Sequence, residues 1–274
     1  ILCFQANIYC VYLCKILRTK IIVRSNSAPT GWSQSFIKKI FYKNALSIAD
    51  KIVVNSLEFK KLLKEKFNVN ATCIYNPLNK FEVLAQSKKK ISSNQFKKRS
   101  LNFINVARFV DQKDHVTLIN AFIKLKNKIN FNLLLVGEGE KEEEIRNLIK
   151  NNNLKRYIKI KKFIKNPFPY IKKSDAFILS SKYEGLPNVL LESIILNKLI
   201  ISSNCPTGPK EILDNGKGGL LFKTGDSIDL AKKILFFVNN KKECDQKIKY
   251  AKKRILRFNF KNNLIKYHQL INNF

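Results

Sequence analysis

The stretch FNLLLVG, residues 131–137, places four apolar residues in succession and ends on a glycine. A strand with one face in water alternates apolar and polar residues, and this run does not. It is therefore typical of a strand that is covered on both faces, as in a parallel sheet. Similar runs recur with helical patterns between them, and we expect strands at residues 102–107, 131–136, 157–160, 175–180, 199–203 and 219–222.

Repeated β-α units of this kind predict a doubly wound α/β domain. Ligands of such sheets bind beyond the carboxyl ends of the strands. The chemistry is therefore expected in the loops that follow residues 107, 136, 160 and 180.

Residues 1–78 predict a second α/β unit, in which short β-branched runs mark strands at 20–24, 51–54 and 71–75. Apolar side chains at helical spacing predict a helix over 33–48. The apolar segment 1–17 contains Gln5 and Asn7, is too short and polar for a membrane span, and is expected to form a buried helix. Because the chain contains no methionine, we expect this unit to lack its beginning.

Residues 79–100 are polar and basic without periodicity, so we expect a linker or an exposed loop there. The whole chain carries 52 Lys and Arg against 20 Asp and Glu, a net charge of +32. This excess is compatible with nucleic acid, an anionic membrane or phosphorylated ligands, and also with a coding bias that fills solvated faces with Lys. The six cysteines contain no CxxC pair, which indicates reduced thiols.

Two cations flank the loop after the first strand of the larger domain. In NVARFVDQKDH, residues 105–115, Arg108 lies at the strand end and Lys113 near the start of the next helix. Charge-assisted hydrogen bonds to a diphosphate are worth about 1.5–3 kcal/mol each. If the diphosphate is a leaving group, stabilising its charge is also catalysis. We therefore predict that Arg108 and Lys113 bind a diphosphate.

Two carboxylates lie eight residues apart in SSKYEGLPNVLLESI, residues 180–194. Glu184 precedes a helix that Pro187 is suited to begin, and the free amides at the start of that helix form an anion site. Glu192 lies roughly 7–8 Å further along the helix. This spacing suits a ligand with hydroxyl groups at both ends and a diphosphate between them. Ordinary loop and helix charges would give the same spacing.

Other motifs carry weaker signals. VGEGE, residues 136–140, places Gly137 in a tight turn near the expected ligand but lacks the full dinucleotide fingerprint. Gly208 begins a further turn, which either shapes a pocket wall or is purely structural. No acid or Ser partner is suggested for His115 or His268, so both are interpreted as structural or surface residues.

Taken together, RFVDQK, VGEGE, SSKYEGLPNVLLES, NCPTGPKEIL and GGLLF resemble the C-terminal half of the retaining glycosyltransferases of family 4, the group 1 family with the GT-B fold. The resemblance covers residues 101–256, the nucleotide-sugar-binding lobe of that fold. Residues 257–274 are similar to the final helix, which packs back on the N-terminal lobe. The resemblance implies an α/β fold of two Rossmann-like doubly wound lobes, of which the first, residues 1–78, is truncated.

The resemblance also implies roles for single residues. Arg108 and Lys113 match the cations that hold the donor diphosphate and assist its departure. Glu184 and Glu192 match the acids of the family's E-x7-E motif, which face the transferred sugar and the ribose. Further nucleotide-sugar contacts are implied for Gly137, Phe163, Ile164, Asn166, Gly185, Leu186, Pro187 and Asn188. On the acceptor side, the first lobe would contribute Arg24, Ser25 and Asn26.

The protein expected from these features is a retaining transferase with no metal, no other cofactor and no protein nucleophile. It would move a hexose or N-acetylhexosamine from a UDP-sugar to a lipid-linked or lipopolysaccharide- or capsule-type glycan. Its basic surface would hold it, in the cytoplasm, on the inner face of the cell membrane. Two alternatives are a sugar-nucleotide epimerase of the same fold and, disfavoured because the basic linker offers only Phe96 for stacking, a nucleic-acid-binding protein.

Overall fold

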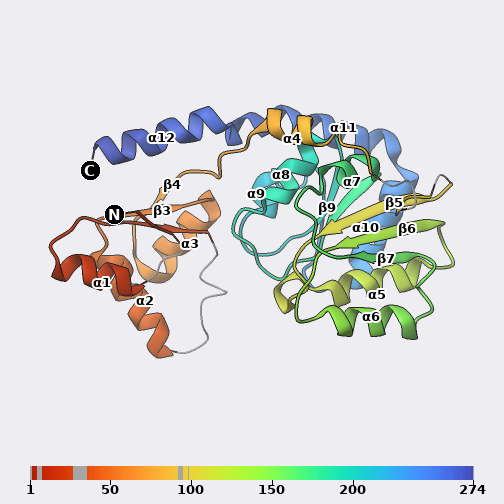
Figure 1. The fold of residues 1–274 in the computed structure, drawn as a ribbon, viewed down its shortest axis with the longest axis horizontal. Coiled ribbons are helices and arrows are strands. Elements are labelled where there is room, and N and C mark those ends of the chain that lie inside the picture. Colours follow the sequence, from red (N-terminus) through yellow and green to blue (C-terminus); the bar gives the residue numbers. More distant parts are fainter. Residues whose placement is uncertain (1, 5–7, 27–35, 92–94, 98, 274) are drawn as a thin grey trace.

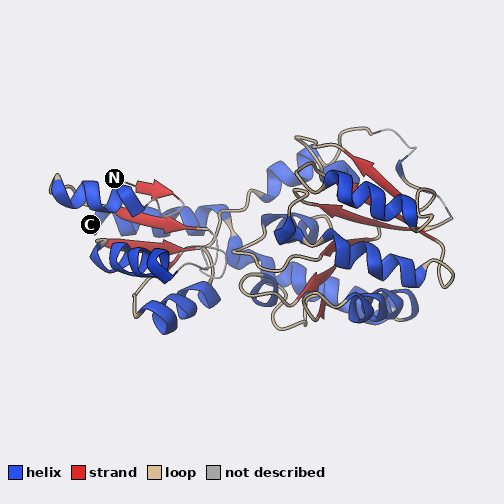
Figure 2. Ribbon diagram, turned by 90° about the horizontal axis from the view of Figure 1, so that it is seen from below, coloured by secondary structure: helices blue, strands red, loops and turns tan. Residues whose placement is uncertain are grey.

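The computed structural model describes residues 2–4, 8–26, 36–91, 95–97 and 99–273. The chain forms two α/β lobes, and a C-terminal helix runs from the second lobe back to the first (Figure 1). In each lobe the described strands form one parallel sheet between helices (Figure 2). The predicted α/β class with Rossmann-like lobes is therefore confirmed.

The first lobe contains a sheet of four described strands in the order β1-β2-β3-β4. Burial of both sides of this sheet gives two apolar clusters, one under helices α1 to α3 and one under the C-terminal helix. The elements of this lobe are β1 (Leu2–Phe4), α1 (Ile8–Ile16), β2 (Ile22–Ser25), α2 (Phe36–Ile48), β3 (Lys51–Val54), α3 (Leu57–Phe67) and β4 (Thr72–Cys73).

The second lobe contains a sheet of six described strands in the order β10-β9-β8-β5-β6-β7. All six strands expected from the sequence form, with small shifts at their ends. The elements are β5 (Leu101–Val106), η3 (Asp111–Lys113), α5 (His115–Leu125), β6 (Phe131–Val136), α6 (Glu142–Asn151), β7 (Ile158–Lys161), α7 (Phe168–Lys173), β8 (Ala176–Leu179), α8 (Asn188–Ile195), β9 (Leu199–Ser203), α9 (Pro209–Ile212), β10 (Leu220–Phe222), α10 (Ser227–Asn239) and α11 (Lys241–Arg254).

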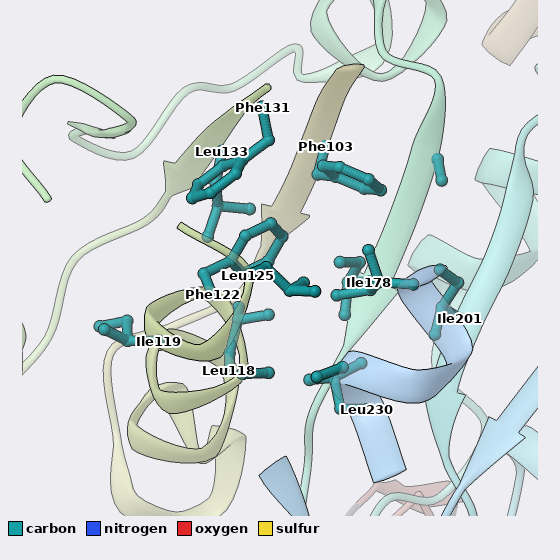
Figure 3. Close-up of a cluster of buried hydrophobic side chains, with 14 of the residues drawn as sticks. Phe103, Leu118, Ile119, Phe122, Leu125, Phe131, Leu133, Ile178, Ile201 and Leu230 are labelled. Carbon is teal, nitrogen blue, oxygen red and sulfur yellow. The ribbon is translucent and has the colours of Figure 1, made fainter. Parts of the chain in front are cut away.

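The core of the second lobe explains why the run FNLLLVG forms a strand. Alternate side chains of β6, Phe131 and Leu133, enter a cluster between the sheet and helices α5 and α10 (Figure 3), whereas Leu134 enters the cluster on the opposite face. The rings of Phe122 and Phe131 lie 4.7 Å apart. Full burial of one such side chain stabilises the fold by about 1.5–3 kcal/mol, so a strand that is apolar on both faces is held from both sides.

The C-terminal segment leaves the second lobe through η4 (Ile255–Phe258) and continues as α12 (Phe260–Asn272). Tyr267 and Leu270 of α12 pack against the first sheet, and the guanidinium carbon of Arg24 lies 5.6 Å from the centre of the Tyr267 ring. Helix α12 therefore lies over the first lobe and is joined through η4 to the second, as Figure 1 shows.

Two expectations for the N-terminal half need correction, one for residues 1–17 and one for the linker. Residues 1–17 do not form one buried helix, because residues 2–4 form the edge strand β1 and helix α1 leaves Tyr9 and Ile16 exposed. Gln5 and Asn7 lie outside the described residues. The expectation rested on the apolar composition of the segment, and composition cannot show whether another element covers its side chains.

The expected helix at 33–48 is present as α2, with residues 33–35 outside the described part. Of the apolar side chains that predicted it, Leu46 is buried, while four are exposed: Phe36, Ile37, Ile40 and Phe41.

The expected linker contains a helix, α4 (Lys80–Gln86), with Asn79 as its side-chain cap and Val83 buried in the second lobe. Seven-residue α4 spans only about two turns, which is too short for a helical periodicity to be read.

Candidate functional site

The switch point of the second sheet lies between β5 and β8, which are neighbours although β6 and β7 lie between them in sequence. Ligands of parallel sheets bind at the carboxyl edge near such a point. The loops that leave β5 and β8 are joined there, since the Gln112 amide donates to Tyr183 O and Lys182 N donates to Gln112 O, both at 2.8 Å. Ser180 Oγ donates to Lys113 O at 2.8 Å. These bonds fix the two loops that carry the expected catalytic residues.

Two of those residues, Lys113 and Glu184, are in direct contact. Lys113 Nζ lies 2.5 Å from Glu184 Oε1, and the Ser181 hydroxyl donates to the same oxygen at 2.6 Å. The side chains of Lys113 and Glu184 are only 16% and 8% exposed, so water screens their attraction little. The geometry makes a carboxylate that is held in one orientation by a cation and a hydroxyl.

Buried hydroxyl groups, which we did not predict, hold the main chain around Glu184. Thr207 Oγ1 donates to Glu184 O, and Ser203 Oγ donates to Ser181 O at 2.6 Å. Glu184 N donates to Pro206 O at 3.2 Å. The loops after β8 and β9 therefore position Glu184 together. The available sequence signal was a pair of adjacent serines at each strand end: Ser180 and Ser181 directly follow β8, and Ser202 and Ser203 end β9.

The other expected cation, Arg108, lies in the same β5 loop and is exposed. Its guanidinium has no hydrogen bond or ion pair among the described residues. Gly137 packs against this loop, since a Cβ atom on Gly137 would come within 1.9 Å of Ala107 O. The glycine that we expected near the ligand thus lets the β6 loop pack against the main chain that presents Arg108.

The second carboxylate, Glu192, lies on α8 and is largely buried. Desolvation raises its pKa to about 7, and its carboxyl group has no partner among the described residues. Helix α8 begins at Asn188, with Pro187 as the N-cap rather than the first helical residue. Gly185 and Leu186 precede it and are buried. A partly buried carboxylate therefore lies about one turn from a helix start whose first amides can bind an anion.

The three residues expected near the base have different surroundings. Phe163 is 68% exposed in the loop after β7, and Ile164 is half-buried against the core of the second lobe. The Asn166 amide donates to Gln86 O at 3.0 Å, and its oxygen accepts from Phe168 N. Asn166 is therefore engaged in holding α4, and the exposed ring of Phe163 is the group of the three that a ligand can reach.

The expected acceptor-side residues approach the loop that follows Glu184. Arg24 donates to Asn76 Oδ1 at 2.6 Å, and the Asn76 amide donates to Asn188 Oδ1 at 2.7 Å and to Leu186 O at 3.4 Å. Asn76, which was missed in the sequence, thus links a strand end of the first lobe to the start of α8. No local pattern reveals it, because its partner Arg24 is 52 residues away and its partners in the second lobe are more than 100 residues away.

Asn26 also touches this loop. A Cβ atom on Gly185 would come within 1.7 Å of Asn26 O, and Asn55 donates its amide to the same oxygen at 3.3 Å. Only a glycine permits this approach of the two lobes. Ser25, the third expected acceptor-side residue, is buried in β2.

The histidines occupy positions outside this cluster. His115 is buried against Phe109, its Nε2 lies 3.0 Å from Asn105 Oδ1, and burial lowers its pKa to about 4. His268 is exposed on α12. Within the described part of the chain, no three His, Cys, Asp or Glu side chains gather as metal ligands. No described helix is both long and apolar enough to cross a membrane.

Comparison with known proteins identifies a matching family model and relatives of this chain. The family model for the group 1 glycosyl transferases matches residues 86–254, more than half of the chain. An uncharacterized glycosyltransferase of Methanocaldococcus jannaschii is 34% identical over 205 residues, which cover 71% of this chain and 50% of the relative.

A 4-alpha-N-acetylgalactosaminyltransferase of Campylobacter jejuni, which acts on an N-acetylgalactosamine-N,N'-diacetylbacillosaminyl-diphospho-undecaprenol, is 26% identical over 74% of this chain and 56% of its own length. The chain thus spans about half the length of these relatives. Among solved structures, Anabaena HepE in complex with UDP superposes with a TM-score of 0.83 at 17% identity, over 100% of this chain and 79% of HepE. This likeness shows the GT-B fold.

Proposed function

Since the chain belongs to the group 1 glycosyltransferases, we propose that it acts as a retaining transferase that moves a hexose or N-acetylhexosamine from a UDP-sugar to a lipid-linked or lipopolysaccharide- or capsule-type glycan. The observation that carries this proposal is the buried Lys113–Glu184 pair at the switch point of the second sheet, with Arg108 in the same loop. Together they supply positive charge for a diphosphate and an oriented carboxylate for a sugar.

The donor would lie across the carboxyl edge of the second sheet. Glu192 would accept hydrogen bonds from the ribose hydroxyls, and the amides between Gly185 and Asn188 would hold phosphate and sugar oxygens. Two relatives support the donor class: HepE is known in complex with UDP, and the Campylobacter jejuni relative transfers N-acetylgalactosamine. A UDP-linked N-acetylhexosamine is therefore the first donor to test.

The proposed reaction needs no protein nucleophile and no metal ion. The bond between the anomeric carbon and the diphosphate oxygen breaks as the acceptor hydroxyl attacks from the same face, and the hydroxyl proton passes to the departing phosphate oxygen. Arg108 and Lys113 stabilise the charge that develops on that oxygen. Glu184, fixed by Lys113 and Ser181, orients the transferred sugar.

The acceptor and the membrane would meet the first lobe. Helices α1 and α2, with the residue that follows α1, expose a set of apolar side chains, here called the α1–α2 surface: Leu13, Ile16, Leu17, Phe36, Ile37, Ile40 and Phe41. Exposed cations flank it at Lys15, Arg18, Lys39 and Lys43. An apolar patch bordered by cations is complementary to an anionic bilayer, where a diphospho-polyprenyl acceptor of the kind named for the Campylobacter jejuni relative would reside.

Turnover of UDP-sugars with and without acceptor tests the proposal. Incubation with UDP-N-acetylglucosamine or UDP-N-acetylgalactosamine and a diphospho-polyprenyl acceptor should release UDP and give a glycosylated lipid with the anomeric configuration of the donor. A sugar-nucleotide epimerase would instead alter the donor without any acceptor. An inverted product, or epimerisation alone, would overturn the proposal.

A further inference from the structure

Helix α3 of the first lobe is capped by a carboxylate of the second lobe. Glu211, on the short helix α9, accepts hydrogen bonds from Leu57 N at 3.1 Å and from Glu58 N at 3.2 Å. The Tyr75 hydroxyl donates to Glu211 Oε1 at 2.6 Å. We call these three hydrogen bonds the Glu211 bridge. All three donors belong to the first lobe or to the segment that leaves it.

The Glu211 bridge supplies hydrogen-bond acceptors to main-chain amides that have no acceptor within α3. The first four amides of a helix have no partner within the helix. The side chain of the N-cap residue Ser56 accepts from Phe59 N, and Glu211 accepts from Leu57 N and Glu58 N, so three of these amides have acceptors outside the regular helical bonds. A negative charge at this end is also favoured by the helix dipole. These attractions offset the repulsion from Glu58, whose pKa is raised by burial and by the Glu211 charge.

The same segment of the second lobe holds Glu184. Thr207, four residues before Glu211, donates to Glu184 O, and Pro206 O accepts from Glu184 N. Gly208 is packed so closely that a Cβ atom there would come within 2.4 Å of Gly185 O. On the other side, Arg257 Nη2 donates to Glu211 O and to Ile212 O, which anchors α9 to the segment that leads into α12.

From this arrangement we propose that Glu211 is an interlobe positioning residue: by bonding α3, it fixes the 204–208 loop, and through that loop Glu184, against the acceptor lobe. The inference rests on the proposed function for the role of Glu184. The proposal distinguishes donor binding from acceptor alignment, because Glu211 is not among the residues proposed to contact UDP. Donor binding should therefore not require Glu211, whereas alignment of the Glu184 loop with an acceptor should.

Hydrogen exchange measured by mass spectrometry tests the bridge directly, with Glu211→Ala and Glu211→Gln as variants. Glu65→Gln is the matched control, because Glu65, on α3, lines the same pocket as Glu211 but pairs, among the described residues, only with Lys61 at 3.6 Å. In Glu211→Ala, the amides of Leu57 and Glu58 and the amide of Glu184 should all exchange about tenfold faster or more. Glu211→Gln, which keeps one acceptor oxygen, should lie between this variant and the wild type.

Two further readouts distinguish positioning from general destabilisation. Exchange of the β6 amides should be unchanged, and calorimetric UDP affinity should equal that of the wild type. In the transfer assay kcat should fall about tenfold with the donor KM unchanged.

Unchanged exchange at Leu57 and Glu58, or acceleration there without acceleration at Glu184, would overturn the proposal. A loss of UDP affinity parallel to the loss of kcat would also overturn it, by placing Glu211 in the donor site. If the wild type fails to bind UDP, the proposed function fails, and the exchange data still decide whether the bridge positions Glu184.

Discussion

Lys113 Nζ lies 2.5 Å from Glu184 Oε1, and both side chains are nearly buried. The cation expected to bind a diphosphate is thus already paired with the carboxylate expected to face the sugar. Removing one member of a buried pair leaves the other charge without compensation, at a cost of about 3–5 kcal/mol. In the proposed function the pair would therefore link donor recognition to the orientation of Glu184.

Replacement of Lys113 by Ala should lower kcat for transfer by about 10²–10³-fold, because one donor of transition-state stabilisation is lost. The matched control is Lys182→Ala, which removes a cation from the adjacent loop that pairs with Asp111 at the surface. The control should stay within about twofold of the wild type, since exposed pairs contribute about 0–1 kcal/mol. Equal rates for both variants would contradict the assigned role of Lys113.

The affinity for a UDP-sugar should rise with pH through about 7, the pKa to which burial raises Glu192. Below that pH the carboxyl group is protonated, and above it the carboxylate can accept bonds from both ribose hydroxyls. Glu192→Gln should abolish this dependence. A UDP-sugar is preferred to UDP, because the terminal phosphate of UDP also titrates near neutral pH. An equal pH profile in the variant would show that another group titrates.

Gly185→Ala should separate donor binding from transfer. The new Cβ would come within 1.7 Å of Asn26 O, so the lobes must move apart. UDP affinity should change by a few-fold at most, whereas transfer should be lost. Gly225→Ala is the control: it places a side chain at a positive φ where no atom lies within 4 Å, and it should keep its activity. An active Gly185→Ala variant would argue against close approach of the lobes during transfer.

Binding to vesicles that contain phosphatidylglycerol should depend on the α1–α2 surface. Ile37→Glu with Phe41→Glu should weaken binding about tenfold or more, because burial of each apolar side chain is worth about 1.5–3 kcal/mol. Phe81→Glu is the control, since Phe81 is 84% exposed but lies on α4, outside this surface. Deletion of the basic residues between 88 and 99 tests whether the linker contributes. Equal binding by all variants, or none by the wild type at low salt, would refute membrane docking.

The sequence was sufficient for most of the second lobe, because its strands are apolar on both faces and need no partner information. The run at 131–136 forms β6 over the predicted residues. The prediction of elements and their burial failed where a segment is covered by residues distant in the sequence. Segment 1–17 forms an edge strand followed by a half-exposed helix, and the short α4 has a single buried residue, Val83.

The candidate site likewise contains contacts that the sequence predicts and contacts that it does not. Lys113 and Glu184 follow strand ends that meet at one edge of a parallel sheet, so their proximity could be anticipated. Asn76 and Glu211 act across the lobes, on partners more than 100 residues away, and neither periodicity nor spacing carries that information.

Calorimetric titration with UDP tests the central claim, nucleotide-sugar binding at the second sheet, most directly. The wild type should bind UDP saturably, and Arg108→Ala and Glu192→Ala should each weaken binding about tenfold or more. The control Arg146→Ala, which removes a surface arginine paired with Glu142, should bind like the wild type. Equal binding by all four proteins, or no binding of UDP, GDP or ADP by the folded chain, would contradict the account.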